Sequence, residues 1–223
     1  MFALSIIAAH GLAPRRPDDA GPFARATFGS LNPTLKLGYS RPLQQRDLPP
    51  LRQEDSSRLV TARLDDELFV LAATGCADHP VGRALWRSFG AEFSRAGLLK
   101  LASDACQLAT PLLLKRIIGL LEKPGGDAAA LRAGMLASSL LLLTSSAQAL
   151  CLRHYLVRVS TTGLRVRAAL TGALYRKLLR LSPAAQLASS GELVNLVGAD
   201  AQRIADLTPY LHALWFAPLQ VAA

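Results

Sequence analysis

The stretch AGMLASSLLLLTSSAQALCL, residues 133–152, is twenty residues long and contains no charged side chain. As an α-helix it spans about 30 Å, the thickness of the hydrocarbon core of a bilayer. The core helix of a soluble protein is the alternative interpretation, but such a helix normally keeps one polar face. The stretch therefore favours an all-α, polytopic membrane protein.

The residues that follow this stretch are basic. From Arg153 to Gly191 the chain has seven basic residues and no acidic one. Basic residues next to an uncharged span mark its cytoplasmic end. Leucines continue at helical spacing, so we expect one helix from about Leu131 to about Leu181, some 75 Å long. A kink is expected, if anywhere, at Ser160–Gly163, where STTG lowers helix propensity.

The composition of the whole chain fits the same class. Of 223 residues, 51% are hydrophobic and 18% charged, and the net charge is +9. A basic chain is also typical of nucleic-acid binding, but these basic residues are not interleaved with base-stacking aromatics, so we expect no nucleic-acid partner. The three cysteines are far apart and imply neither a disulfide framework nor a metal site.

The sequence before residue 85 differs from the rest in its proline, glycine and charge content. We interpret residues 1–84 as a cytoplasmic N-terminal linker, partly disordered, with one or two short helices. One of these begins at Ser56 or Ser57. Residues 85–223 then form a partial transmembrane domain with its N-terminus in the cytoplasm. Its three spans are expected at Phe89–Leu121, at Leu131–Leu152 and from Leu207 onward.

The stretch SSGELVNLVGADAQRI, residues 189–204, predicts a short bounded helix. Ser189 and Glu192 have the spacing of a capping box, and Gly198 suits a left-handed C-terminal stop. Asp200 then caps the next helix. A short amphipathic helix suits the groove of another protein, with Leu193 and Leu196 turned toward it. A simple turn between two helices is the open alternative.

Two blocks of sequence resemble the C subfamily of ATP-binding-cassette exporters, the multidrug-resistance-associated type. The first is LNPTLKLGYSRPLQQRDLPPLRQEDSS with the following AGLLKLASDACQLATPLLLKRIIGLLE. The second runs from LRVRAALTGALYRKLLRLS through SSGELVNLVGADAQRIADLTPYLHALWFAPLQV. The resemblance covers about residues 31–223 and corresponds to the first half of the first core transmembrane domain.

The resemblance implies roles for particular residues. A coupling helix that docks on a nucleotide-binding domain would comprise Gly191, Glu192, Leu193, Asn195 and Leu196. The third span would start at Asp200, Gln202 and Arg203. Basic side chains near the spans, which either attract anionic substrates or only set topology and snorkel, are Lys100, Lys115, Arg116 and Arg153.

The resemblance also implies an ATP-driven exporter of amphipathic or anionic organic substrates. Its partners would be nucleotide-binding domains, the remaining transmembrane helices, the lipid bilayer and the substrate. ATP and magnesium would bind in the complete transporter. The chain contains no G-x-x-x-x-G-K-[ST] phosphate loop, so we expect it to bind no ATP itself and to have no catalytic residue. A truncated or regulatory helical membrane protein without transport activity is the alternative. A reading frame continuing past Ala223 would discriminate between the two.

Overall fold

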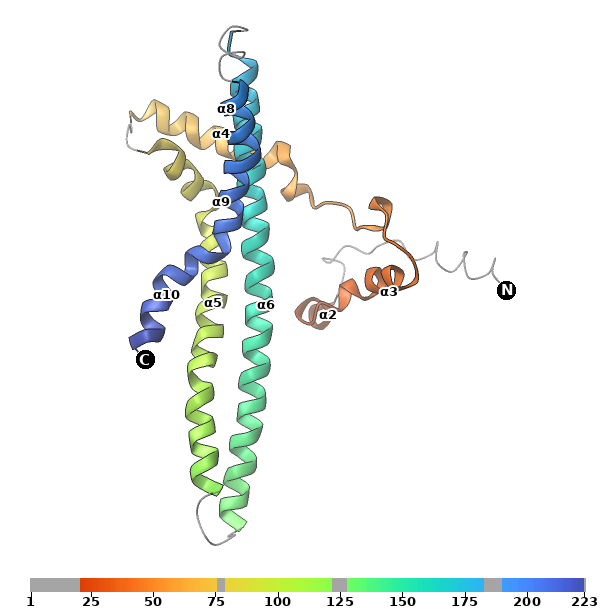
Figure 1. Cartoon of the computed structure of the whole chain (residues 1–223), viewed down its shortest axis with the longest axis vertical. Coiled ribbons are helices and arrows are strands. Elements are labelled where there is room, and N and C mark those ends of the chain that lie inside the picture. The colour runs from red at the N-terminus through yellow and green to blue at the C-terminus, as the bar shows by residue number, and fades with distance from the viewer. Residues whose placement is uncertain (1–20, 76–78, 122–127, 183–189, 223) are drawn as a thin grey trace, which may run out of the picture. The chain divides into compact units, whose positions relative to one another are not determined.

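The computed structural model describes residues 21–75, 79–121, 128–182 and 190–222. Every regular element in these ranges is helical, which confirms the predicted all-α fold (Figure 1). The chain forms two compact units, Met1–Gln53 and Glu54–Ala223. Of the predicted linker, residues 1–84, the first twenty residues lie outside the described ranges.

The first unit contains short helices joined by turns. They are α2 (Pro22–Ala26), η2 (Gly29–Leu31), α3 (Asn32–Ser40) and η3 (Gln45–Asp47). The Arg41 guanidinium donates two hydrogen bonds of 2.7 Å to Asp47, whose carboxylate also accepts the Gln44 backbone N–H. The Arg41 and Gln44 bonds hold the pKa of Asp47 at about 2, below its ordinary value. This part of the predicted linker therefore has defined local structure.

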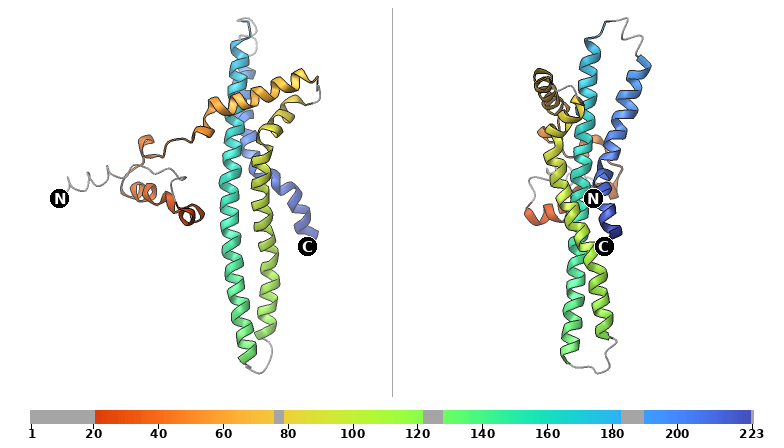
Figure 2. Two further views of the ribbon diagram at one scale, coloured as in Figure 1. Left: turned by 180° about the vertical axis from the view of Figure 1, so that it is seen from behind. Right: turned by 90° about the vertical axis from the view of Figure 1, so that its left-hand side faces the viewer.

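Two long helices dominate the second unit. Helix α5 (Pro80–Leu121) and helix α6 (Ala128–Leu179) lie side by side in both views of Figure 2. Helix α6 has 52 residues, and it runs unbroken through Ser160–Gly163. The prediction of one long helix from about Leu131 to about Leu181 is confirmed. Among the described residues, α6 is the one helix that is long and apolar enough to cross a membrane.

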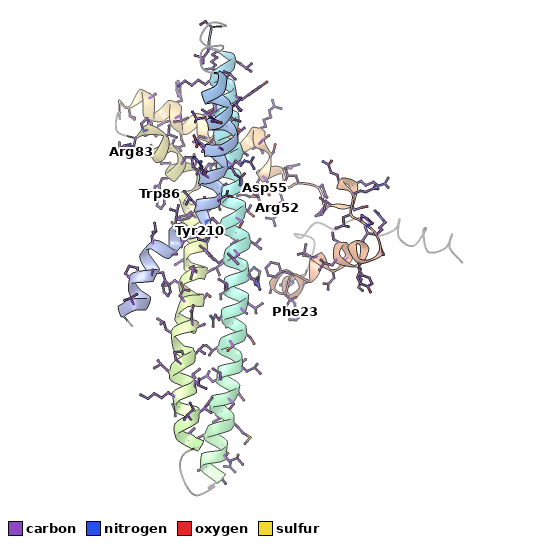
Figure 3. The ribbon with its side chains drawn as sticks, in the orientation of Figure 1. Phe23, Arg52, Asp55, Arg83, Trp86 and Tyr210 are labelled. Atoms are coloured by element: carbon purple, nitrogen blue, oxygen red, sulfur yellow. The ribbon has the colours of Figure 1, made fainter. Side chains whose placement is uncertain are left out.

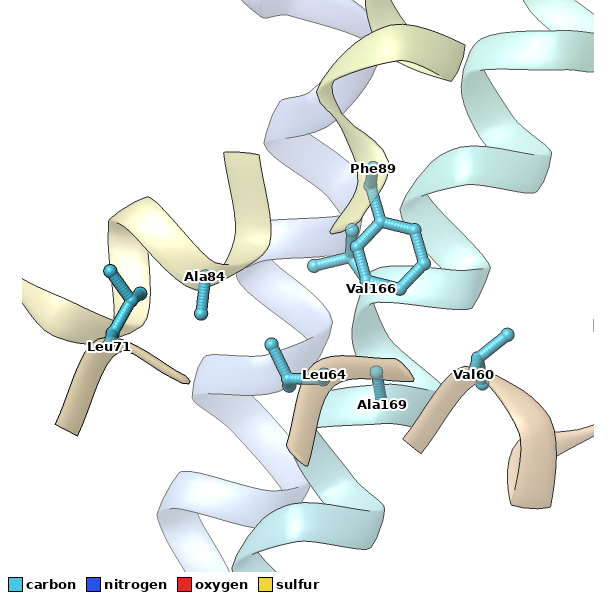
Figure 4. Packing of buried hydrophobic residues seen from close by; sticks show 7 residues of the cluster. All are labelled: Val60, Leu64, Leu71, Ala84, Phe89, Val166 and Ala169. Atoms are coloured by element: carbon cyan, nitrogen blue, oxygen red, sulfur yellow. The ribbon is translucent and has the colours of Figure 1, made fainter. Parts of the chain in front are cut away.

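Helix α4 (Ser57–Ala73) packs across α5 and α6 and builds the main apolar core. Ser56 occupies the predicted position before its first turn, although its side chain makes no capping hydrogen bond. Leu64 and Leu71 are buried against Ala84 of α5 and Ala169 of α6 (Figure 4). The compact unit thus starts at Glu54, and α4 packs with the long helices although it precedes residue 85.

A close approach of α4 to α6 depends on Gly172. A Cβ at this position would lie 2.2 Å from Thr61 Oγ1, a distance that no real side chain adopts. The Thr61 hydroxyl donates to the Ser57 carbonyl in its own helix at 2.6 Å. Glycine therefore allows the two backbones to meet where any other residue would separate them.

The C-terminal segment is a continuous helical path of five elements. They are α8 (Ser190–Asn195), the π-helical η5 (Leu196–Asp200), α9 (Ala201–Leu207), the 3-10 turn η6 (Thr208–Tyr210) and α10 (Leu211–Ala222). This corrects the predicted stop at Gly198, which lies inside the π-helical turn without a positive φ. Asp200 is also no cap: its backbone is helical and its side chain makes no capping bond.

The helix does not stop at Gly198 because a wider helical turn can accommodate an extra residue without ending the helix. A π-helical turn keeps the backbone hydrogen-bonded with i→i+5 pairs, so Leu196–Asp200 continues from α8 into α9. Glycine permits a left-handed stop but does not enforce one. The predicted capping box involves Ser189, outside the described ranges, and the Glu192 side chain, also outside them.

Candidate coupling segment and helix junction

The predicted coupling residues lie in α8 and the turn that follows it. Gly191 and Asn195 are exposed, and Leu196 is half-buried. The side chains of Glu192 and Leu193 are outside the described part of the chain. Val194 is 72% exposed, so it is an apolar side chain available to a partner. Sequence reasoning missed Val194, because the predicted face was drawn through Leu193 and Leu196.

The residues predicted to start the third span lie on α9 and just before it. Arg203 is exposed and pairs with Asp200 at 3.1 Å. Gln202 donates to Asp206 one turn later at 2.6 Å. These are local contacts along one helix, and the apolar helix α10 begins only at Leu211.

Helix α9 lies against α6 at Gly163. A Cβ at Gly163 would lie 2.9 Å from the Ala205 carbonyl oxygen and 3.4 Å from Thr208 Cβ. Ala201 and Ala205 are buried on the α9 side of this contact. Small residues let two helix backbones approach closely, as in membrane helix pairs. The STTG segment is therefore a helix-crossing point, and its glycine has a packing role that propensity alone did not indicate.

A buried polar junction joins α10 to both long helices. The Tyr155 hydroxyl of α6 donates to the Pro209 carbonyl in η6 at 2.5 Å, and it lies 3.4 Å from His212 Nδ1. The His212 ring stacks on Phe93 of α5, with 3.9 Å between ring centroids. Tyr155 and His212 are both nearly fully buried. The junction fixes the 3-10 turn that separates α9 from α10.

Gly97 of α5 makes room for this junction. A Cβ there would lie 2.6 Å from His212 Nε2, so a larger residue would displace the imidazole. The sequence marked His212 only as the one titratable residue in an uncharged segment. Its partners are more than 50 residues away along the chain, and no local spacing identifies them.

The four predicted substrate-path charges are not gathered into one site. Lys100 forms an ion pair with Asp104 on α5, and its ammonium lies 4.8 Å from the Phe216 ring centroid of α10. Asp104 is almost fully buried, and its Oδ2 has no hydrogen-bond partner. Lys115, Arg116 and Arg153 are exposed on the long helices. Only Lys100 belongs to the region where three helices meet.

The second unit thus contains α6, which is long enough to cross a membrane and continues beyond its uncharged segment, and the helical elements from α8 to α10 that follow it. Within the described ranges, no group of three His, Cys, Asp or Glu side chains is placed to hold a metal ion. The family model of the ABC transporter transmembrane region matches residues 94–222, from within α5 to the end of α10. The chain belongs to this family. Residues 94–222 are therefore a transmembrane region of the ABC-transporter type.

The relatives identify the C subfamily, as the sequence resemblance predicted. The chain is 31% identical to human ATP-binding cassette sub-family C member 3, over 93% of its own length. It is 34% identical to Dictyostelium discoideum ABC transporter C family member 8, over 92%, and 30% identical to human sub-family C member 4, over 94%. The chain spans 15%, 13% and 16% of these relatives.

The similarity to the relatives extends beyond the family model. A match over 93% of the chain must include residues before 94, because residues 94–222 make up a smaller share. The segment that contains α4 and the start of α5 is thus part of what this chain has in common with C-subfamily transporters. This agrees with the sequence block from Leu31 to Ser57 that carried the resemblance.

Proposed function

We propose that this transporter segment carries movement from a nucleotide-binding domain to the spans of an ATP-driven exporter, and that the exported molecules are amphipathic or anionic organic compounds. The observation that supports this most strongly is the length of α6. After Leu152 the helix continues for 27 residues to Leu179, about 40 Å beyond the uncharged segment. A single helix of this kind transmits displacement over distance without a hinge.

The proposed mechanism is conformational. ATP binding closes two nucleotide-binding domains, and the segment around α8 moves with the domain that holds it. Helix α9 follows α6 because the two backbones meet at Gly163. The Tyr155–Pro209 hydrogen bond then passes the movement to α10 at the third span. The spans alternate between inward-facing and outward-facing arrangements, with the N-terminus on the cytoplasmic side.

The Lys100 site supports the anionic substrate class. Its ammonium is already balanced by Asp104, so an anionic group reaches it by competing with this carboxylate. Phe216 is an apolar neighbour of the ammonium, although its own side chain is buried. Lys115, Arg116 and Arg153 have no such apolar partner among the described contacts, and their charge fits topology as well as binding.

The test places aspartate at the proposed docking surface. In a complete C-subfamily exporter that carries this segment, Val194→Asp and Leu196→Asp should leave ATP binding intact. Substrate-stimulated ATP hydrolysis and transport should fall together, because a buried interface does not tolerate an unpaired charge. The matched control is Leu164→Asp, an exposed leucine of α6 away from the tip. Unchanged transport in both tip variants would contradict the coupling role and leave the segment as a helix turn.

Topology is tested separately with engineered cysteines. A cysteine at Gly125 or Gly126 should react with an impermeant reagent added outside the cell, whereas one at Ser189 should not. The opposite labelling pattern would reverse the proposed orientation. The wild-type segment must also support ATP-dependent transport in its host. If it does not, the alternative of a regulatory membrane protein without transport activity gains support.

A further inference from the structure

One arginine on α6 gathers carboxylates from two other parts of the second unit. The Arg165 guanidinium donates to Asp55 Oδ1 through Nε at 2.6 Å, and its Nη2 lies 2.5 Å from the same oxygen. Its Nη1 donates to Glu92 Oε2 at 2.7 Å. Glu54 Oε1 lies 3.4 Å from Nη2. The Arg165 side chain is only 13% exposed, so the cluster is largely enclosed by protein.

The partners of Arg165 come from separate elements. Asp55 and Glu54 belong to η4 (Gln53–Asp55), immediately before α4, and Figure 3 labels Asp55 there. Glu92 belongs to α5 and also accepts a hydrogen bond of 3.1 Å from Arg63 of α4. The Arg165 cluster, defined as Arg165, Arg63, Glu54, Asp55 and Glu92, therefore connects α4, α5 and α6 at one point.

The position of Arg165 along α6 sets its environment. It lies 13 residues beyond Leu152, about 20 Å past the end of the uncharged segment. It is also two residues beyond Gly163, where α9 touches α6, and seven before Gly172, where α4 touches α6. The cluster therefore sits outside the expected hydrocarbon region, between two close helix crossings.

The geometry differs from that of an ordinary surface ion pair. Exposed pairs contribute about 0–1 kcal/mol because water screens them and long side chains lose freedom. Arg165 instead places three guanidinium nitrogens against carboxylates from two elements. Several such bonds fix the orientation of the planar guanidinium. The cluster has three carboxylates and two arginines. Removing Arg165 leaves neighbouring carboxylates facing one another with one arginine.

We propose that Arg165 is a positioning residue that fixes the start of α4 and the N-terminal part of α5 to α6, so that movement of the α6 tip reaches α5 without slippage. This inference rests on the proposed coupling function. It adds a second route to the one through α9 and α10, and it assigns a role to the segment before α4. The packed core alone resists separation of these helices, whereas directional hydrogen bonds resist sliding between them.

The first experiment measures the clamp itself on the full chain in lipid nanodiscs. Spin labels replace two exposed side chains, Leu59 on α4 and Tyr175 on α6. The wild-type chain should give one narrow distance distribution. Arg165→Met should broaden it, because α4 then slides on its apolar contact with α6. The control is Arg176→Met, which removes the exposed Arg176–Asp65 ion pair between the same two helices. It should leave the distribution narrow.

The second experiment separates stability from coupling. Arg165→Met alone should reduce the yield of folded protein, since it leaves unpaired carboxylates. The triple variant Arg165→Met, Asp55→Asn, Glu92→Gln removes those charges and should restore the yield. In a complete C-subfamily exporter carrying this segment, its transport per ATP hydrolysed should still fall about fivefold or more, the lower end of typical coupling between sites.

The outcomes distinguish this inference from the proposed function. A triple variant with wild-type transport per ATP, or a narrow distance distribution in Arg165→Met, would overturn the positioning role. If the wild-type segment supports no transport in the exporter, the proposed function fails. In that case the nanodisc measurement still decides whether Arg165 fixes α4 and α5 to α6.

Discussion

The two halves of α6 differ in how many of their side chains are buried. Between Ala128 and Leu152 most leucines are exposed, and Ala137 is the one buried residue among those whose burial is described. Between Arg153 and Leu179 the buried positions recur through the helix and are often small or polar. They are Tyr155, Val159, Thr162, Gly163, Val166 and Ala169. In the first half Gln148 contacts Ser103 of α5, whereas the second half contacts α4 at Ala169, α5 at Tyr155 and α9 at Gly163.

This difference is what we expect if the first half lies in lipid and the second half in water. In lipid, apolar side chains need no protein partner, because the acyl chains are as apolar as leucine. In water, a helix is stabilised mainly by packing one face against other elements. The second half of α6 has its own tertiary contacts, and we expect the first half to depend on the bilayer and on further helices.

The largest effect is expected from a charge placed at matched leucines in the two halves of α6. Leu143 in the membrane half is 65% exposed, and Leu164 in the projecting half is 59% exposed. Leu143→Lys should raise the apparent free energy of membrane insertion by about 3 kcal/mol, because lysine near the centre of a bilayer-spanning helix is poorly solvated. Leu164→Lys should change it by less than about 0.5 kcal/mol. Glycosylation mapping in microsomes measures both, and equal costs would contradict the assignment of the halves.

The next largest effect is expected at the helix crossing. Gly163→Leu forces a side chain against the Ala205 carbonyl and should destabilise the chain by about 1–3 kcal/mol, as overpacking does. Gly134→Leu is the control in the membrane half, since nothing lies within 4 Å of a Cβ there. Thermal unfolding in one detergent compares the two. A Gly163 variant as stable as the Gly134 variant would show that α9 does not pack at this point.

A smaller loss is expected at the junction of α6 with η6. Tyr155→Phe removes the hydrogen bond that the Tyr155 hydroxyl donates to the Pro209 carbonyl. The free energy of unfolding should therefore fall by about 1 kcal/mol. Tyr175→Phe alters an exposed tyrosine of the same helix and should cost nothing measurable. The same unfolding assay applies. Equal stability of the two variants would argue against a buried Tyr155 hydroxyl.

The smallest effect concerns the exposed ion pair between α6 and α4. Arg176→Gln should lower stability by no more than about 0.5 kcal/mol, because Arg176 and Asp65 are both partly in water. Added salt should reduce even this difference. A loss that exceeds the Tyr155→Phe effect would mean that the exposed pair, rather than buried packing, holds α4 to α6.

Sequence reasoning predicted the long α6 because its evidence is local and continuous. Residues 133–152 contain no charged side chain, and leucines continue at helical spacing after Leu152. Both signals depend only on neighbouring residues. The predicted helix stop at Gly198 was wrong because glycine permits a stop, but the backbone there stays hydrogen-bonded in a π-helical turn.

The contacts that position the candidate site could not be predicted from local sequence patterns. Arg165 and Asp55 are 110 residues apart, and Tyr155 and Pro209 are 54 apart. The sequence shows the residue types but not which helices meet. Gly163 illustrates the limit, since its low helix propensity suggested a kink while its missing side chain serves a helix crossing.

We expect α6 to be one helix that leaves the membrane and continues into water. The measurement is a nitroxide scan along residues 131–179 in nanodiscs, with oxygen and a nickel chelate as collision partners. We expect high oxygen access up to about Leu152, then nickel access that oscillates with a period of 3.6 residues through Leu179. Loss of that period at Ser160–Gly163, or a second oxygen-rich region beyond Arg153, would contradict it.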